Sequence, residues 1–193
     1  MAEAEPRGDD APVAASKKDP AAEAKSWLGD AAEGTVIGRA VTINRPVAEV
    51  YAYFRDFANL PGFMENVVSI DVRDDKTSHW VVKAPAGRTV EWDALVTDES
   101  ENSFIAWEAQ PGADVPNSGR VDFRDAGARG TVVTATITYD PPAGIVGKIV
   151  AKMFQREPAI QARRDLRRFK QLMETGEIAT PAKNRQEFEE MGL

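Results

Sequence analysis

The feature that most constrains this sequence is a series of six short segments with strand character between residues 66 and 139, each ended by a turn signal. Asp74-Asp75-Lys76, Pro85-Ala86-Gly87 and Asp125-Ala126-Gly127 are three of these signals. Strands joined by such short turns pair as antiparallel neighbours. The predicted strands are 66–73, 78–84, 88–97, 103–109, 119–124 and 131–139, with a turn at 99–102 and a longer loop at 110–117.

Helical patterns flank this series on both sides. Upstream, residues 38–43 alternate as a further strand, Pro46 opens a short helix through Phe54, and a second short helix lies around 57–60, before Pro61-Gly62. Downstream, a long helical pattern spans 144–175, which Pro158 should kink or break, and Gly176 is a plausible cap. One amphipathic helix must then cover one face of the sheet, which predicts an α+β fold of about seven antiparallel strands.

Composition sets the expected boundaries. Residues 1–34 hold few large apolar side chains, so we expect a disordered acidic N-terminal tail. Residues 35–177 form the predicted domain, and residues 178–193 are expected to be a flexible polar tail.

Charge and residue usage exclude several classes of function. The net charge is −7, which disfavours nucleic acid as a partner. The chain has no cysteine and one histidine, and it lacks both a calcium-loop spacing and a phosphate-binding loop, so we expect no metal and no cofactor. No apolar run is long enough for a membrane span, and no secretory signal is present, so a cytoplasmic location is expected.

Hairpin register predicts one apolar face of the sheet. A turn at 85–87 places Trp80 opposite Trp92 and Val82 opposite Val90, and the preceding turn places Ile70 opposite Trp80. The same face continues over the next strands, and it is either a filled core or the wall of a ligand cavity. The predicted cavity-lining residues are Ile70, Trp80, Val82, Trp92, Ala94, Ile105, Trp107, Val121, Phe123 and Tyr139 from the strands, with Tyr51, Ile149 and Met153 from the flanking elements.

Several motifs together resemble a known superfamily. They are 46–51 (PVAEVY), 56–61 (DFANLP), 83–87 (KAPAG), 91–94 (EWDA), 105–107 (IAW), 165–170 (DLRRFK) and 174–177 (ETGE). Over residues 36–177 the chain resembles the SRPBCC superfamily, also called START-like or Bet v 1-like, in its polyketide cyclase/dehydrase and coenzyme Q-binding branch. The resemblance implies a helix-grip fold, in which a curved sheet wraps a long C-terminal helix around a hydrophobic cavity.

Three functions are compatible with these features. The first is a carrier or sensor that binds a lipid, quinone or polyketide-like molecule. The second is an aromatase/cyclase-type enzyme, for which Tyr51, Tyr139, Arg120 and Gln155 could supply polar groups. The third is a ligand-free interaction domain. His79 is predicted to face outward, away from such chemistry.

The late helix is basic on an acidic chain. Its cationic residues are Arg156, Arg163, Arg164, Arg167, Arg168 and Lys170. One interpretation is a solvated helix face paired with nearby acids. The alternative is a patch for anionic headgroups, and thus peripheral membrane contact, or for a partner at the cavity mouth.

Overall fold

The computed structural model describes residues 35–84, 87–139 and 158–179. The predicted N-terminal tail, residues 144–157 of the predicted long helix, and residues 180–193 of the predicted C-terminal tail lie outside the described residues. The elements in chain order are β1 (Thr35–Ile43), α2 (Val47–Arg55), η3 (Phe57–Gly62), β2 (Val67–Val72), β3 (Thr77–Ala84), β4 (Arg88–Ser100), β5 (Phe104–Ala109), β6 (Asn117–Asp125), η5 (Gly127–Arg129), β7 (Thr131–Tyr139) and α4 (Pro158–Thr175).

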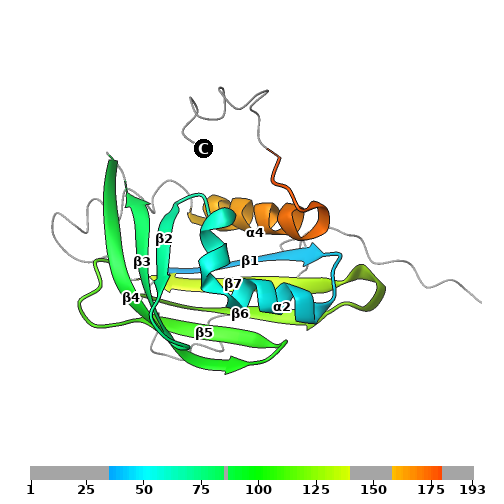
Figure 1. Ribbon diagram of the computed structural model, residues 1–193, viewed down its shortest axis with the longest axis horizontal. Helices are drawn as coiled ribbons and strands as arrows, with labels where there is room; N and C mark the ends of the chain where they lie inside the picture. The colour runs from blue at the N-terminus through cyan, green and yellow to red at the C-terminus, as the bar shows by residue number, and fades with distance from the viewer. Residues whose placement is uncertain (1–34, 85–86, 140–157, 180–193) are drawn as a thin grey trace, which may run out of the picture.

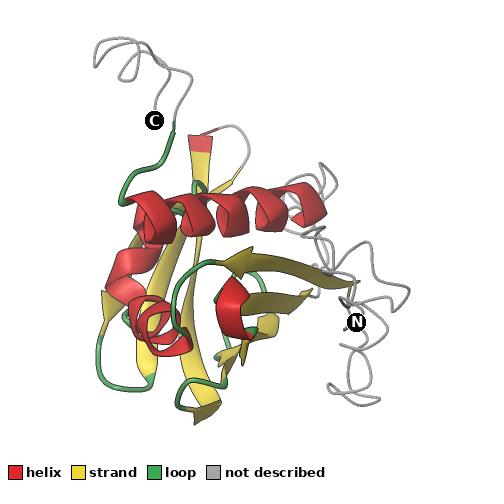
Figure 2. Ribbon diagram, turned by 90° about the vertical axis from the view of Figure 1, so that its right-hand side faces the viewer, coloured by secondary structure: helices red, strands yellow, loops and turns green. Residues whose placement is uncertain are grey.

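The strands form one antiparallel sheet of seven, in the order β1-β7-β6-β5-β4-β3-β2. Figure 1 shows the sheet curving, and Figure 2 shows α4 lying across one side of it. The predicted fold class is therefore confirmed. The predicted register is also confirmed, since Trp80 pairs with Trp92 and with Ile70, and Val82 pairs with Val90.

Strand β4 is one of several strands, with β1 and β6, that are longer than the sequence predicts. β4 continues to Ser100, whereas alternation predicts an end at Thr97. The reason is a register shift in which Val96 pairs with Trp107 and Asp98 pairs with Ala106, so that Thr97 is an extra residue. Such a bulge breaks the alternation of side chains while the pairing continues, and it bends the strand.

The described part of the long helix begins at Pro158. The kink or break predicted at Pro158 involves residues before it, which lie outside the described residues. Gly176 lies in the left-handed region at φ 77°, and its N–H donates to the carbonyl of Leu172 at 2.8 Å. The predicted glycine cap is therefore confirmed.

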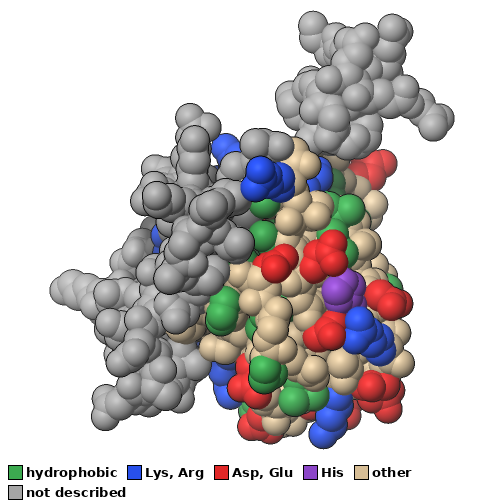
Figure 3. All heavy atoms as spheres, turned by 90° about the vertical axis from the view of Figure 1, so that its left-hand side faces the viewer, with side chains coloured by type: hydrophobic (Ala, Val, Ile, Leu, Met, Phe, Trp, Pro, Cys, Tyr) green, Lys and Arg blue, Asp and Glu red, His purple; other side chains and the backbone are tan. Residues whose placement is uncertain are grey.

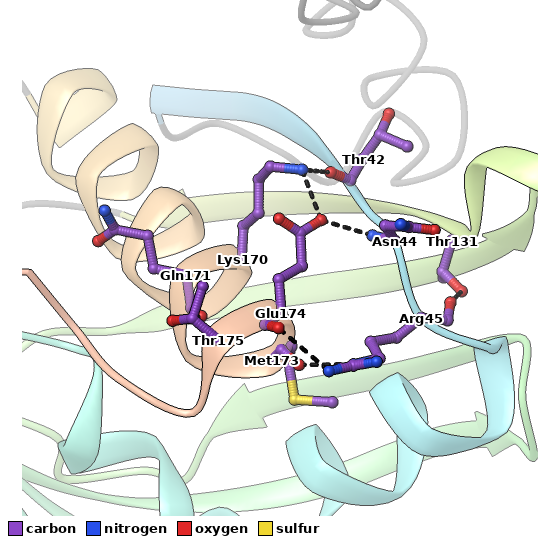
Figure 4. A network of polar contacts seen from close by, with 9 residues as sticks. All are labelled: Thr42, Asn44, Arg45, Thr131, Lys170, Gln171, Met173, Glu174 and Thr175. Carbon is purple, nitrogen blue, oxygen red and sulfur yellow. Dashed lines mark hydrogen bonds and ion pairs between the residues drawn. The ribbon is translucent and has the colours of Figure 1, made fainter.

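Polar contacts fix the C-terminal end of α4 to the end of β1 (Figure 4). Lys170 donates to the backbone carbonyl of Thr42 and to the carboxylate of Glu174, both at 2.7 Å, and Glu174 accepts from the Asn44 N–H at 2.6 Å. Arg45 donates to the Met173 carbonyl at 2.7 Å, which satisfies one of the free carbonyls that end a helix.

Four phenylalanines join the helices to the sheet. Phe169 of α4 is fully buried and stacks on Phe63 at a centroid distance of 4.6 Å. Phe54 of α2 contacts Phe169 and also Phe123 of β6, each at 5.7 Å. These rings close one part of the space between helix and sheet and leave the remainder as a cavity.

Candidate functional site

A cavity of about 260 Å³ lies between the inner face of the sheet, η3 and α4. The helical segments and the loop after η3 contribute Phe54, Phe57, Leu60, Phe63, Met64, Gln161, Ala162, Asp165 and Leu166 to its lining. The strands and the adjoining loops contribute Ile37, Asn66, Val67, Ser78, Trp80, Val82, Trp92, Ala94, Val96, Ile105, Trp107, Val115, Asn117, Val121, Ala135 and Ile137. Most of these side chains are apolar.

Two tryptophans with nearly parallel rings form part of the cavity wall. The rings of Trp80 and Trp92 lie 6.2 Å apart with their planes inclined by only 8°. Their pairing across β3 and β4 puts both side chains on the inner face. Trp80 donates its ring N–H to the buried hydroxyl of Ser78 at 2.9 Å, so its polar atom is satisfied within the wall.

The third tryptophan of the wall depends on a glycine. Trp107 lies against Gly119, its partner on β6. A Cβ on Gly119 would overlap the indole, with Cη2 at 2.5 Å and the Thr136 carbonyl at 2.7 Å. Only glycine therefore leaves room for the ring in this position.

The structure places most of the predicted strand residues on the cavity wall. Those that line the cavity are Trp80, Val82, Trp92, Ala94, Ile105, Trp107 and Val121. Ile70, Tyr51 and Phe123 belong instead to the packed cluster around α2, where the rings of Tyr51 and Phe123 lie 5.4 Å apart. The side chain of Tyr139, and the whole of Ile149, Met153 and Gln155, lie outside the described residues.

Arg120 does not point inward, although the enzyme hypothesis considered it as a polar group of the cavity. Its neighbours Gly119 and Val121 occupy the register of the cavity wall, and alternation turns Arg120 to the outer face. There its guanidinium lies 3.5 Å from the centre of the Phe104 ring and pairs with Asp122 at 2.7 Å.

His79 lies on the outer face, as predicted, within a group of charged side chains (Figure 3). Its Nδ1 lies 2.7 Å from Asp93, which also pairs with Arg73 at 2.9 Å. The hydrogen bond with His79, followed by the one from Arg73, holds the pKa of Asp93 below its usual value. This group has the character of a surface ion network and is separated from the cavity by the sheet.

Polar side chains also line the cavity, and the sequence interpretation missed them. They are Asn66, Ser78, Asn117, Gln161 and Asp165. Asp165 is the ionisable one among the described lining residues. Oδ1 of Asp165 accepts hydrogen bonds from the Glu65 N–H at 3.3 Å and from Gln161 Nε2 at 3.0 Å.

Burial raises the pKa of the Asp165 carboxyl from its usual 3.8 to about 7, because water no longer stabilises the charged form. The helical period held a signal for this residue. Ala162, Asp165, Leu166 and Phe169 recur at helical spacing and fall on one stripe of α4, so a carboxyl within an apolar stripe was the signal.

The predicted basic face of α4 is exposed in part. Arg163, Arg164 and Arg167 are exposed, and within the described residues none of the three makes an ion pair. Lys170 pairs with Glu174, and Arg156 lies outside the described residues. A patch for anionic headgroups or a partner stays a prediction.

No helix in the described segments has the length and apolarity that crossing a bilayer requires.

Comparison with known proteins identifies the family. The family profile described as polyketide cyclase / dehydrase and lipid transport matches residues 35–174, and the chain belongs to this family. A crystal structure of a Deinococcus radiodurans protein is 43% identical, with a TM-score of 0.61, and the match covers 74% of this chain and 99% of that one. No curated protein matches the sequence.

More distant structures share the fold. A Thermus thermophilus protein is 22% identical with a TM-score of 0.60, over 71% of this chain and 95% of that one. An aromatase/cyclase from Streptomyces is 13% identical with a TM-score of 0.59, over 75% of this chain and 99% of that one. At these identities the likeness concerns the fold alone.

Proposed function

We propose that this chain binds a hydrophobic small molecule of the lipid, quinone or polyketide-like class in the cavity, as a carrier or sensor. The observation that carries the proposal is the cavity of about 260 Å³ with its mostly apolar wall. Water in a protein interior needs two to four polar partners, which most of this wall does not offer. An apolar ligand would therefore gain more from the space than water would.

The volume limits the size of that ligand. An apolar cavity of about 150 Å³ holds benzene, so the present cavity suits a fused bicyclic ring system or a short branched chain. The aromatic rings of Trp80 and Trp92 in its lining favour planar, aromatic ligands. The same volume counts against the third hypothesis, a fully packed domain without a ligand.

One observation favours an enzyme of the aromatase/cyclase type as a second candidate. Asp165 places a carboxyl on the cavity wall, where it could take part in proton transfer. Such chemistry generally needs an acid and a base held in geometry with the substrate. Asp165 stands alone as an ionisable group among the described lining residues, so binding is the better supported function.

Native mass spectrometry of the protein purified from its own source tests the binding proposal. We expect the wild type to carry a co-purified hydrophobic molecule. Ala94→Phe puts a ring into the cavity and should abolish this occupancy, because Ala94 is buried on the cavity wall. Ala106→Phe is the matched control: Ala106 lies between two wall residues of β5 and therefore faces outward. A wild type as empty as Ala94→Phe would count against the proposal.

A further inference from the structure

We propose that the carboxyl of Asp165 is the polar anchor of the cavity, and that it donates a hydrogen bond from Oδ2 to a carbonyl oxygen of the ligand. The inference rests on the proposed binding function and narrows it to a class of ligand. That class is a planar apolar ring system with a ketone or quinone carbonyl at one end.

Asp165 lies where α4 approaches the loop between η3 and β2. It lies on α4, one turn beyond Gln161, and both side chains line the cavity. Across from the helix, the loop between η3 and β2 brings the N–H of Glu65 to the carboxyl. The group is thus held between α4 and this loop on a mostly apolar wall.

The hydrogen-bond donors around Asp165 distinguish its two carboxyl oxygens. Both hydrogen bonds that the described residues donate to this carboxyl, from Glu65 N–H and Gln161 Nε2, go to Oδ1. An oxygen that accepts two hydrogen bonds is a poor place for the proton, so the proton of the neutral acid belongs on Oδ2. A neutral carboxyl is then a donor at Oδ2, and the ligand must supply an acceptor.

The charges around Asp165 favour the neutral acid. Burial is the largest influence and raises the pKa to about 7, and the carboxylate of Glu65 acts in the same direction. Arg168, one turn further along α4, acts in the opposite direction, as do the two hydrogen bonds to Oδ1. The balance keeps the proton on Asp165 in mildly acid solution, and above neutral pH the anion would repel a carbonyl oxygen.

Calorimetric titration with two matched probes tests this inference. Tetralin is a bicyclic hydrocarbon, and α-tetralone is the same ring system with one carbonyl. At about pH 5.5 we expect wild type to bind α-tetralone about tenfold more tightly than tetralin, which is what one hydrogen bond can supply. At about pH 8.5 the preference should disappear, because Asp165 is then ionised.

Variants at position 165 test whether the side chain of Asp165 causes the preference for the ketone. Asp165→Asn should keep the ketone preference at both pH values, because the amide retains an oxygen for Gln161 and Glu65 and turns its NH₂ toward the ligand. Asp165→Leu should lose the preference at both. Asp98→Asn, at an exposed position, should behave as wild type.

The outcomes distinguish this inference from the function on which it rests. The wild type could bind tetralin and still prefer α-tetralone equally at both pH values, or Asp165→Leu could keep that preference. Either result would overturn the role of Asp165 as the anchor and leave the binding function intact. At about pH 5.5, tighter binding of an aminotetralin cation than of α-tetralone would also overturn it, since Asp165 would then be an anion where the account requires the neutral acid. Failure of both neutral probes to bind would overturn the binding function together with the anchor.

Discussion

At the scale of single residues, Asp165 has the largest pKa shift among the titratable groups of the described residues. A carboxyl with a pKa near 7 in the folded state binds its proton more tightly than in the unfolded chain, where the pKa is near 3.8. Its contribution to stability is therefore complete below about pH 4. It is lost as the pH rises toward 7, because the unfolded chain releases the proton first.

We predict from this that Asp165→Asn becomes more stable than wild type as the pH rises. The gain in the free energy of unfolding should be small near pH 4, grow up to about pH 7 and then level off at roughly 4 kcal/mol, because a shift of one pKa unit corresponds to about 1.4 kcal/mol. Urea unfolding of both proteins across this range measures it. A difference that stays constant with pH would show that the carboxyl is not perturbed by folding.

At the scale of elements, the packing of β5 on β6 depends on the contact between Trp107 and Gly119. We predict that Gly119→Ala destabilises the protein by about 1–3 kcal/mol, because the added methyl group must displace the indole or the strand backbone. Gly62→Ala is the control, since a Cβ there would meet no atom within 4 Å. Equal unfolding midpoints for the two variants would refute this role of Gly119.

Alternation and turn length were sufficient to predict the sheet at the level of elements. The Trp80–Trp92 pair follows from the position of the turn at 85–87, because a hairpin turn sets the register of both strands. The same logic failed after Val96, where the extra residue Thr97 has no signature in an alternating pattern. Asp165 was missed because the inward face of a helix is identified by its apolar residues, and the period does not by itself single out a charged residue among them.

At the scale of the whole molecule, the cavity arises from how helices and sheet share the space between them. Phe63, Phe123 and Phe169 fill the part nearest α2, and the tryptophan wall borders the part that stays open. Which rings meet, and how far the helix stands from the sheet, are long-range packing results. Sequence periodicity identifies the face that points inward and carries no information on the volume enclosed.

The central claim is that this space accepts a small apolar ligand, and calorimetric titration with tetralin tests it most directly. We predict saturable binding of one tetralin per wild-type chain, the same binding in Ala106→Phe, and none in Ala94→Phe, whose ring occupies the site. Absence of binding to wild type, or undiminished binding to a folded Ala94→Phe, would contradict the account.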